Sequence, residues 1–413
     1  MALKDDAMRE SRLEDIFLSE RARKNLSILD AIRRNGTISK AEISKLVGLN
    51  VVTISNYIDD FLKQHLVLER ELDVSGGGRR PVLLGLNSEA GLAIGVGANL
   101  FDMVAACVDL SGNIVSRIKI DKKSSDVKEV VSLILELIEK TLDSVEKKDK
   151  IKGIGVGIAG IVDKNRETVR WPQKIDDNYN YAMITLPLKD IIEEKFNLPC
   201  IIENDATVAC FGEQWLALDP EIKNVLFLFS GVGLGIMIGG EIYRGSSGCA
   251  GEISIYNRLE NKYFNCDIGK PCLLERWEAD LDILKEAKVA LAQNKHSRIL
   301  DRAKTIDNLM LRDVFEAAKL KDDLALSIIK QAAKRLGIKA AFLVNVFNPQ
   351  VLIIGGGLEA VSDIFLDVVR GTVSEWAFEE TAREVKIIPS TLGENAVALG
   401  AANLVIKQVF SQS

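Results

Sequence analysis

Three short amphipathic segments with sharp boundaries constrain the first eighty residues more than any other feature of the chain. Residues 25–35 place their apolar side chains on one helical face. Ser39 and Glu42 have the spacing of a capping box at the start of a second helix. Gly48 then allows a tight turn, and Asn50 can cap a third helix. This order predicts a helix-turn-helix unit. The side chains expected to face its core are Leu26, Leu29, Ile32, Ile43, Leu46, Val47, Val51, Ile54, Ile58 and Phe61.

A β-hairpin is expected after the third helix. Residues 66–72 and 81–86 have the composition of strands, and the glycine-rich segment 73–78 separates them. Arg79 and Arg80 lie beside the tip, where they can reach DNA phosphates or a narrow minor groove. Three helices followed by such a hairpin predict a winged helix-turn-helix domain. The alternative is a protein-interaction module whose hairpin tip is only a linker.

The third helix also predicts a DNA-reading surface, because the N-terminal part of such a helix enters the major groove. Asn pairs with adenine there, and the methyl groups of Val and Thr contact the thymine methyl. Residues 21–85 hold eleven Lys/Arg against seven Asp/Glu, although the whole chain has a net charge of −6. A basic module ahead of an acidic body agrees with DNA binding. The residues expected at the DNA are Ser39, Asn50, Val52, Thr53, Asn56, Tyr57, Arg79 and Arg80.

The rest of the chain predicts two similar α/β halves, and 413 residues are too many for one compact core. Residues 91–120 have the pattern of three strands, 127–145 of an amphipathic helix and 151–158 of an apolar strand. A similar order recurs from the strand at 225–229 to the helix at 324–347. Two βββαβα halves suit a hinged protein that binds a small molecule between them.

Six motifs carry a family resemblance: residues 38–43 and 76–81 in the N-terminal module, and residues 153–163, 203–206, 245–252 and 355–357 in the body. In this order and spacing they resemble the ROK family of repressors, open reading frames and kinases, and above all its regulator branch, which includes xylose and N-acetylglucosamine repressors. The resemblance covers residues 20–410. It implies an α/β fold, with an N-terminal winged helix-turn-helix followed by a two-lobed actin/hexokinase-like body. The expected parts are an arm or helix at 1–20, the winged domain at 21–87, lobe 1 at 88–205 with a returning helix at 394–410, and lobe 2 at 206–393.

The resemblance also implies a carbohydrate site formed by Asn204, Asp205, Glu252 and Glu275. Carboxylates and amides accept hydrogen bonds from sugar hydroxyls, and burial makes an unpaired partner costly. Asp205 stands where the kinases of the family hold their catalytic base. The family normally places a His three residues after the motif Glu, and this chain has Ile255 there. The exchange removes both a sugar contact and a zinc ligand.

The zinc loop of the family is incomplete in this chain. Cys266 and Cys272 remain, but two cysteines without a nearby histidine do not complete a four-ligand zinc site. We therefore expect no metal and no other cofactor. The other roles for these cysteines are packing or a redox-sensitive pair.

The phosphate-binding stretches of the kinases also differ. Gly97 replaces an acidic residue, and Leu100 and Phe101 supply neither the second glycine nor the hydroxyl of that loop. Val232 replaces a hydroxyl residue in the second loop. We therefore expect a protein that is not an enzyme.

These features together predict a repressor of carbohydrate-utilisation genes whose operator binding responds to a small carbohydrate. We expect a homo-oligomer, a dimer or tetramer, because operators are commonly palindromic. The chain has no stretch of about 18 apolar residues, so we expect a cytoplasmic protein without a membrane segment. The alternatives are an active sugar kinase with an accessory DNA domain, and a regulator that senses a protein partner.

Overall fold

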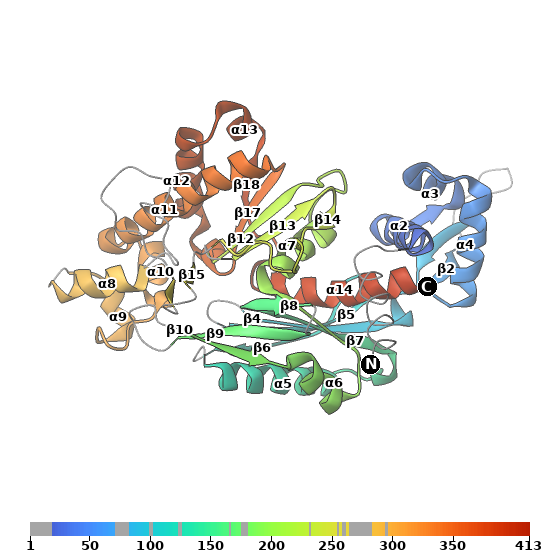
Figure 1. Cartoon of the computed structure of the whole chain (residues 1–413), viewed down its shortest axis with the longest axis horizontal. Helices are drawn as coiled ribbons and strands as arrows, with labels where there is room; N and C mark the ends of the chain where they lie inside the picture. Colours follow the sequence, from blue (N-terminus) through green and yellow to red (C-terminus); the bar gives the residue numbers. More distant parts are fainter. Residues whose placement is uncertain are drawn as a thin grey trace.

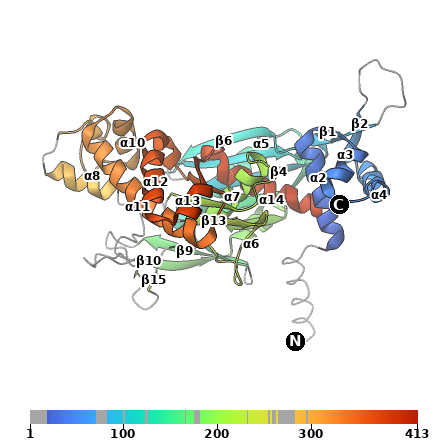
Figure 2. The ribbon, with the colours of Figure 1, turned by 90° about the horizontal axis from the view of Figure 1, so that it is seen from above.

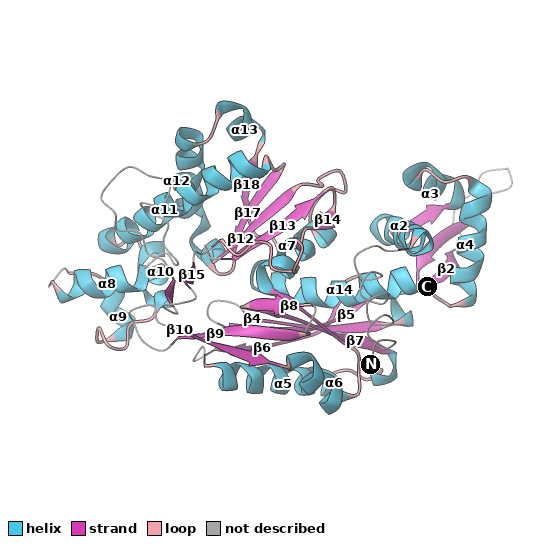
Figure 3. Cartoon of the chain, viewed as in Figure 1, coloured by secondary structure: helices cyan, strands magenta, loops and turns pink. Residues whose placement is uncertain are grey.

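The computed structural model describes residues 19–70, 82–98, 102–122, 126–164, 167–174, 181–230, 233–253, 256–257, 262–263, 283–293 and 296–413. They form a small N-terminal domain and two lobes, each lobe built on a five-stranded sheet (Figure 1). Helices and strands contribute to all three parts (Figure 3). The small domain and the helices of lobe 2 lie at opposite ends of the molecule (Figure 2). The predicted fold class is therefore confirmed.

The small domain is a winged helix-turn-helix. A capping box starts its second helix, where Ser39 Oγ accepts from the backbone N–H of Glu42 and the Glu42 carboxylate accepts from the Ser39 N–H at 2.9 Å. Gly48 ends that helix with a left-handed φ of 72°, and the side chain of Asn50 caps the next helix. The elements are α2 (Glu20–Asn35), β1 (Thr37–Ser39), α3 (Lys40–Val47), α4 (Val51–Lys63), β2 (Val67–Arg70) and β3 (Leu83–Leu86).

Two residues predicted for the core of this domain face solvent instead. Leu46 is 62% exposed and Val51 is 48% exposed. Leu46 lies near the C-terminal end of α3, one turn after the buried Ile43. Val51 is the first residue of α4, one turn before the buried Ile54. The helical period correctly predicted which face of each helix is buried. The apolar core of the domain, however, does not cover the last turn of α3 or the first turn of α4. The short strand β1, which pairs with β3, was not predicted.

Lobe 1 has a sheet with the strand order β11-β7-β4-β5-β6. Helices α5 (Val127–Asp143) and α6 (Leu188–Phe196) cover one of its faces. A three-stranded sheet, β10-β9-β8, lies beside it. The strands are β4 (Leu92–Ala98), β5 (Asp102–Asp109), β6 (Ile114–Asp121), β7 (Ile151–Ile158), β8 (Ile161–Asp163), β9 (Thr168–Lys174), β10 (Tyr181–Leu186) and β11 (Cys200–Asn204).

Lobe 2 has a sheet with the order β14-β13-β12-β17-β18. The helices on its outer face pack against β12, β13 and β17 through a second apolar core. Its strands are β12 (Val225–Phe229), β13 (Gly233–Ile238), β14 (Glu241–Ile242), β15 (Tyr256–Asn257), β16 (Lys262–Tyr263), β17 (Val351–Gly355) and β18 (Lys386–Pro389). Its helices are α8 (Ile283–Ala292), α9 (Ile299–Ala303), α10 (Leu311–Lys319), α11 (Asp323–Phe347), α12 (Ser362–Trp376) and α13 (Glu379–Glu384).

Two helices, α7 (Asp205–Leu216) and α14 (Ala396–Gln412), lie between the two large sheets (Figure 1). Their backbones approach closely because glycine stands at the contacts. A Cβ on Gly400 of α14 would lie 1.8 Å from a backbone oxygen of α7, and a Cβ on Gly95 of β4 would lie 1.9 Å from a backbone oxygen of α14. The packing of α7 on α14 is therefore tight. Within the described residues, no helix has the length and apolar character to cross a bilayer.

Candidate functional site

The outer face of α4 is the candidate DNA interface. Val52 is 72% exposed, Asn56 is also exposed, and Thr53 and Tyr57 are half-buried. Val51, which had been predicted for the core, is 48% exposed at the start of the same helix and adds a further apolar side chain. Such a surface, with one amide among methyl groups, suits contacts to adenine and to thymine methyl groups.

Two of the predicted DNA contacts have structural roles. Ser39 is buried, and its hydroxyl is engaged with Glu42 at 2.7 Å, so it does not present a group to DNA. Asn50 Oδ1 accepts from the Thr53 N–H at 2.8 Å, which uses its oxygen for the helix cap. Arg79 and Arg80 lie outside the described residues.

The candidate sugar site begins where β11 meets α7. Asn204 caps α7 by accepting from the Thr207 N–H at 3.2 Å, and its amide nitrogen donates to the Gly160 carbonyl at 3.3 Å. Asp205 is the first residue of the helix, is buried and accepts from the Ala206 N–H at 2.8 Å. Burial raises the pKa of Asp205 to about 6, although the hydrogen bond and the charge of Lys122 act in the opposite direction.

Glu252 comes from lobe 2 and lies within electrostatic reach of Asp205. Its backbone forms a bridge with Gly233 at the start of β13. Partial removal from water and the negative charge of Asp205 raise the pKa of Glu252 to about 7, although the residue itself is exposed. The structure thus brings three of the four predicted sugar residues, Asn204, Asp205 and Glu252, to one region. Glu275 lies outside the described residues.

A lysine near this pair had not been predicted. Burial lowers the pKa of Lys122, whereas the negative charges of Asp205 and Asp102 act to raise it. Asp102 is itself buried and forms an ion pair with Lys119 at 2.8 Å. Lys122 is one residue beyond the end of β6, and no sequence motif marks it. Its charge partly compensates the carboxylate of Asp205.

A buried carboxylate next to the site joins the two lobes. Glu203 accepts from Arg244 Nε at 2.8 Å and lies 3.3 Å from Lys164 Nζ. Burial alone would raise the pKa of Glu203, but the two cations outweigh it and keep this pKa below its usual range. Arg244 follows β14 and directly precedes the glycine-rich segment 245–252. The ion pair therefore fixes the segment that carries Glu252 against lobe 1.

Of the positions at which the phosphate-binding loops were predicted to differ, Gly97 lies within the described residues. Gly97 lies in β4, where an added Cβ would come within 2.4 Å of the Val397 side chain on α14. A longer acidic side chain at this position therefore needs a shift of α14. Leu100, Phe101 and Val232 lie outside the described residues.

The cysteines give little sign of chemistry in the described parts of the chain. Cys107, Cys200 and Cys210 are buried free thiols, and burial raises the pKa of Cys107 to about 11 and of Cys200 to about 12. Across the described ranges, His, Cys, Asp and Glu side chains form no group of three or more that could hold a metal ion. Cys266, Cys272 and Ile255 lie outside these ranges.

Comparisons with known proteins agree with this geometry. A family model described as "ROK family" matches residues 91–408, and one described as "Winged helix-turn-helix DNA-binding" matches residues 21–67. A putative xylose repressor of Caldicellulosiruptor sp. is 33% identical over 94% of this chain and 96% of its own length. A glucokinase of Halalkalibacterium halodurans is 30% identical over 77% of this chain and 95% of its own length. The crystal structure of a ROK family transcriptional regulator, a homolog of the E. coli MLC protein, superposes with a TM-score of 0.71 at 22% identity and covers 95% of this chain and 96% of that chain.

Proposed function

This chain belongs to the ROK family, and from that premise we propose that it is a sugar-responsive transcriptional repressor. One observation carries the proposal. The same chain holds an outward-facing recognition helix, with Val52 and Asn56 exposed, and two carboxylates, Asp205 and Glu252, that lie close enough for the charge of one to act on the other. The winged domain binds operator DNA, and the body binds the carbohydrate that controls it.

D-Xylose is the first effector to test, because relatives that span nearly the whole chain are named xylose repressors. A pentose presents a row of neighbouring hydroxyl groups, and each can donate to a carboxylate oxygen. Asp205 begins α7, and Glu252 is bridged to Gly233 of lobe 2, so a sugar bound by both carboxylates would connect these two parts. Binding would then favour one relative position of the lobes over the other.

The experiment measures binding of the full-length chain to a DNA duplex from the upstream region of its own gene. Fluorescence anisotropy with and without D-xylose gives both the affinity and its response to the sugar. We expect tight binding that D-xylose weakens, and an unrelated duplex serves as the control. Absence of specific binding at every salt concentration contradicts the proposal. Binding without any response to free sugars favours the alternative of a protein partner.

We propose further that the body does not transfer phosphate. Gly97 supports this, since the space that an acidic side chain would need is occupied by Val397. Without such a partner, Asp205 accepts hydrogen bonds from hydroxyl groups and does not deprotonate one for attack on a phosphoryl group. The test is a coupled ADP-release assay with ATP, Mg²⁺ and a panel of sugars. Turnover of about 1 s⁻¹ or faster, which is ordinary for a kinase, contradicts this part of the proposal.

The proposed assembly is a homodimer without bound metal. A palindromic operator requires two winged domains related by twofold symmetry, and light scattering of the full-length chain measures the mass directly. Cys266 and Cys272 lack the His that would complete a zinc site. Stoichiometric zinc in the purified protein, measured by mass spectrometry of the metal, contradicts the metal-free assignment.

A further inference from the structure

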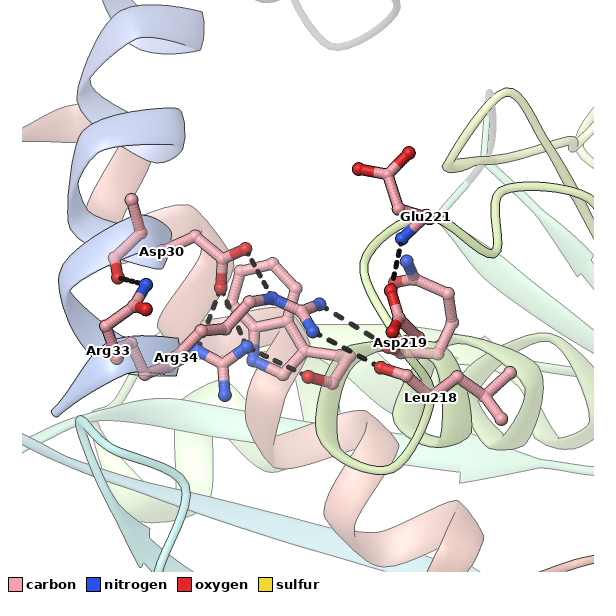
Figure 4. Close-up of polar contacts among 10 residues, drawn as sticks. Asp30, Arg33, Arg34, Leu218, Asp219 and Glu221 are labelled. Atoms are coloured by element: carbon pink, nitrogen blue, oxygen red, sulfur yellow. Dashed lines mark hydrogen bonds and ion pairs between the residues drawn. The ribbon is translucent and has the colours of Figure 1, made fainter. Parts of the chain in front are cut away.

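Three charged residues on the last turns of α2, which we call the α2 clamp, face the body. Asp30 Oδ1 accepts from Arg33 Nε and Nη2 at 2.9 and 2.7 Å, and Asp30 Oδ2 accepts from Arg34 Nε at 2.9 Å. The Arg33 and Arg34 side chains are only 6% and 18% exposed. Asp30 therefore fixes the direction in which both guanidinium groups point (Figure 4).

Both guanidinium groups donate hydrogen bonds to backbone carbonyl groups at the C-terminal end of α7. Arg33 Nη2 donates to the Trp215 carbonyl at 2.9 Å, and Arg34 donates to the Gln214 and Leu218 carbonyls at 3.4 Å. The Cζ atom of Arg33 also lies 4.4 Å from the centroid of the Trp215 ring. The last carbonyl groups of a helix lack partners within it and carry the negative end of its dipole, so cations are favourable there.

The other end of the same helix is the candidate sugar site, with Asn204 as its cap and Asp205 as its first residue. The twelve residues of α7 span about 18 Å. Every residue from Asp205 to Trp215 is buried, and the helix is packed between α14 and the sheet of lobe 2. A helix enclosed on all sides responds to a force at one end by moving as a unit.

A second contact holds the winged domain independently of the clamp. Helix α14 packs along α2, and the Asn25 side chain donates to the backbone carbonyl of Ser413. Removal of the clamp therefore leaves the winged domain attached to the body. The clamp is the contact that joins α2 directly to the end of α7 by hydrogen bonds.

We propose that α7 couples the sugar site to the winged domain, and that the α2 clamp is the joint through which a movement of α7 repositions the recognition helix. This inference rests on the proposed function. A sugar that binds Asn204 and Asp205 displaces α7, and the clamp carries the displacement to α2. Two recognition helices must match the spacing of two half-sites, so a shift of a few ångströms lowers specific affinity. The sugar must bind one position of α7 more tightly than the other.

The experiment compares the full-length chain with the variants R33Q/R34Q and R21Q/R23Q. Arg21 and Arg23 are exposed on the same helix, and the ion pair that Arg21 forms with Asp60 stays inside the winged domain. Each variant removes two positive charges from α2, but only the first breaks the contact with α7. Anisotropy measures affinity for the upstream duplex with and without D-xylose, and calorimetry measures affinity for D-xylose.

We expect D-xylose to weaken DNA binding by a factor on the order of 10 in the wild type and in R21Q/R23Q, within the usual range of allosteric coupling. R33Q/R34Q should bind D-xylose as the wild type does, while its DNA affinity changes less than about twofold on adding the sugar. A full sugar response in R33Q/R34Q overturns the inference. If circular dichroism shows that this variant is unfolded, Asp30→Ala takes its place, because it keeps both arginines but removes their shared partner.

A wild-type chain that binds no duplex, or that ignores D-xylose, contradicts the proposed function rather than the coupling. Hydrogen exchange then tests the coupling without any sugar. Asp205→Ala should change the exchange rates of residues 20–35 in the wild-type background and leave them unchanged in the R33Q/R34Q background. The inference is overturned if Asp205→Ala in the wild-type background leaves the exchange rates of α2 unchanged.

Discussion

Asp205→Asn should make the body more stable at neutral pH. The carboxylate of Asp205 is buried, and its pKa is raised from 3.8 to about 6. A shift of this size means that keeping the group ionised in the folded state costs about 3 kcal/mol. Asparagine keeps an oxygen that can accept from the Ala206 N–H, which is 2.8 Å away in the wild type. The variant therefore removes the cost of the buried charge and keeps the hydrogen bond.

The sign and size of the effect follow from linkage. Between pH 3.8 and 6 the folded state holds the Asp205 proton and the unfolded state does not, so the wild type loses stability as pH rises through this window. Asparagine does not titrate. The charged groups nearby, Lys122 and Glu252, remain in both proteins. The gain of Asp205→Asn should be about 3 kcal/mol at pH 7.5 and clearly smaller at pH 5.

Urea unfolding followed by tryptophan fluorescence measures this difference. All four tryptophans lie after residue 170, so the signal reports the body and not the winged domain. Asp301→Asn, which removes one exposed negative charge, is the control and should change stability by less than about 0.5 kcal/mol. The reasoning is refuted if Asp205→Asn is less stable than the wild type at pH 7.5, or if its gain is the same at both pH values.

Three further predictions concern other parts of the molecule. Asn56→Ala should lower affinity for the upstream duplex by about 1–3 kcal/mol and leave binding to random DNA unchanged, as measured by competition anisotropy. Gly400→Ala should destabilise the body by at least about 1–3 kcal/mol, because its Cβ would lie 1.8 Å from a backbone oxygen of α7. Gly371→Ala is its control, since a Cβ at this helical position meets nothing within 4 Å; equal Tm values for the two would refute the packing argument. Arg244→Gln should lower stability by about 1–2 kcal/mol, because Glu203 stays buried and loses one of its two cations while Lys164 and water compensate in part. The difference in Tm between Arg244→Gln and the wild type should become smaller as the pH is lowered and Glu203 is protonated. A difference that does not change with pH would contradict this.

The sequence was most informative where local chemistry decides the structure. The capping box at Ser39, the left-handed turn at Gly48 and the cap at Asn50 are interactions between residues at most three or four apart, and all three are confirmed. The same local reasoning placed Leu46 and Val51 in the core. It could not show where the core ends, because this depends on the length of each helix that neighbouring elements cover.

Contacts between distant parts of the chain could not be predicted in the same way. Arg33 and Trp215 are separated by 182 positions, and neither belongs to a recognisable motif. Lys122 is likewise an ordinary lysine after a strand until the fold brings it near Asp205. Family motifs located Asn204, Asp205 and Glu252, since these positions recur in a fixed order. They contain no information about the residues that tune the charge of the site or connect it to the winged domain.

The two ends of α7 differ in how well their charges are compensated, and this difference explains how a sugar can act on the helix. At the C-terminal end, Arg33 and Arg34 satisfy backbone carbonyls and are held by Asp30. At the N-terminal end, burial leaves the carboxylate of Asp205 under-compensated. Sugar hydroxyls that donate to this carboxylate recover part of the free energy that its burial costs. Ligand binding therefore gains most at the end of α7 that is least stable without it. Asp205→Asn, which relieves the same cost permanently, should accordingly give a protein that is more stable and binds DNA, but responds weakly to the sugar.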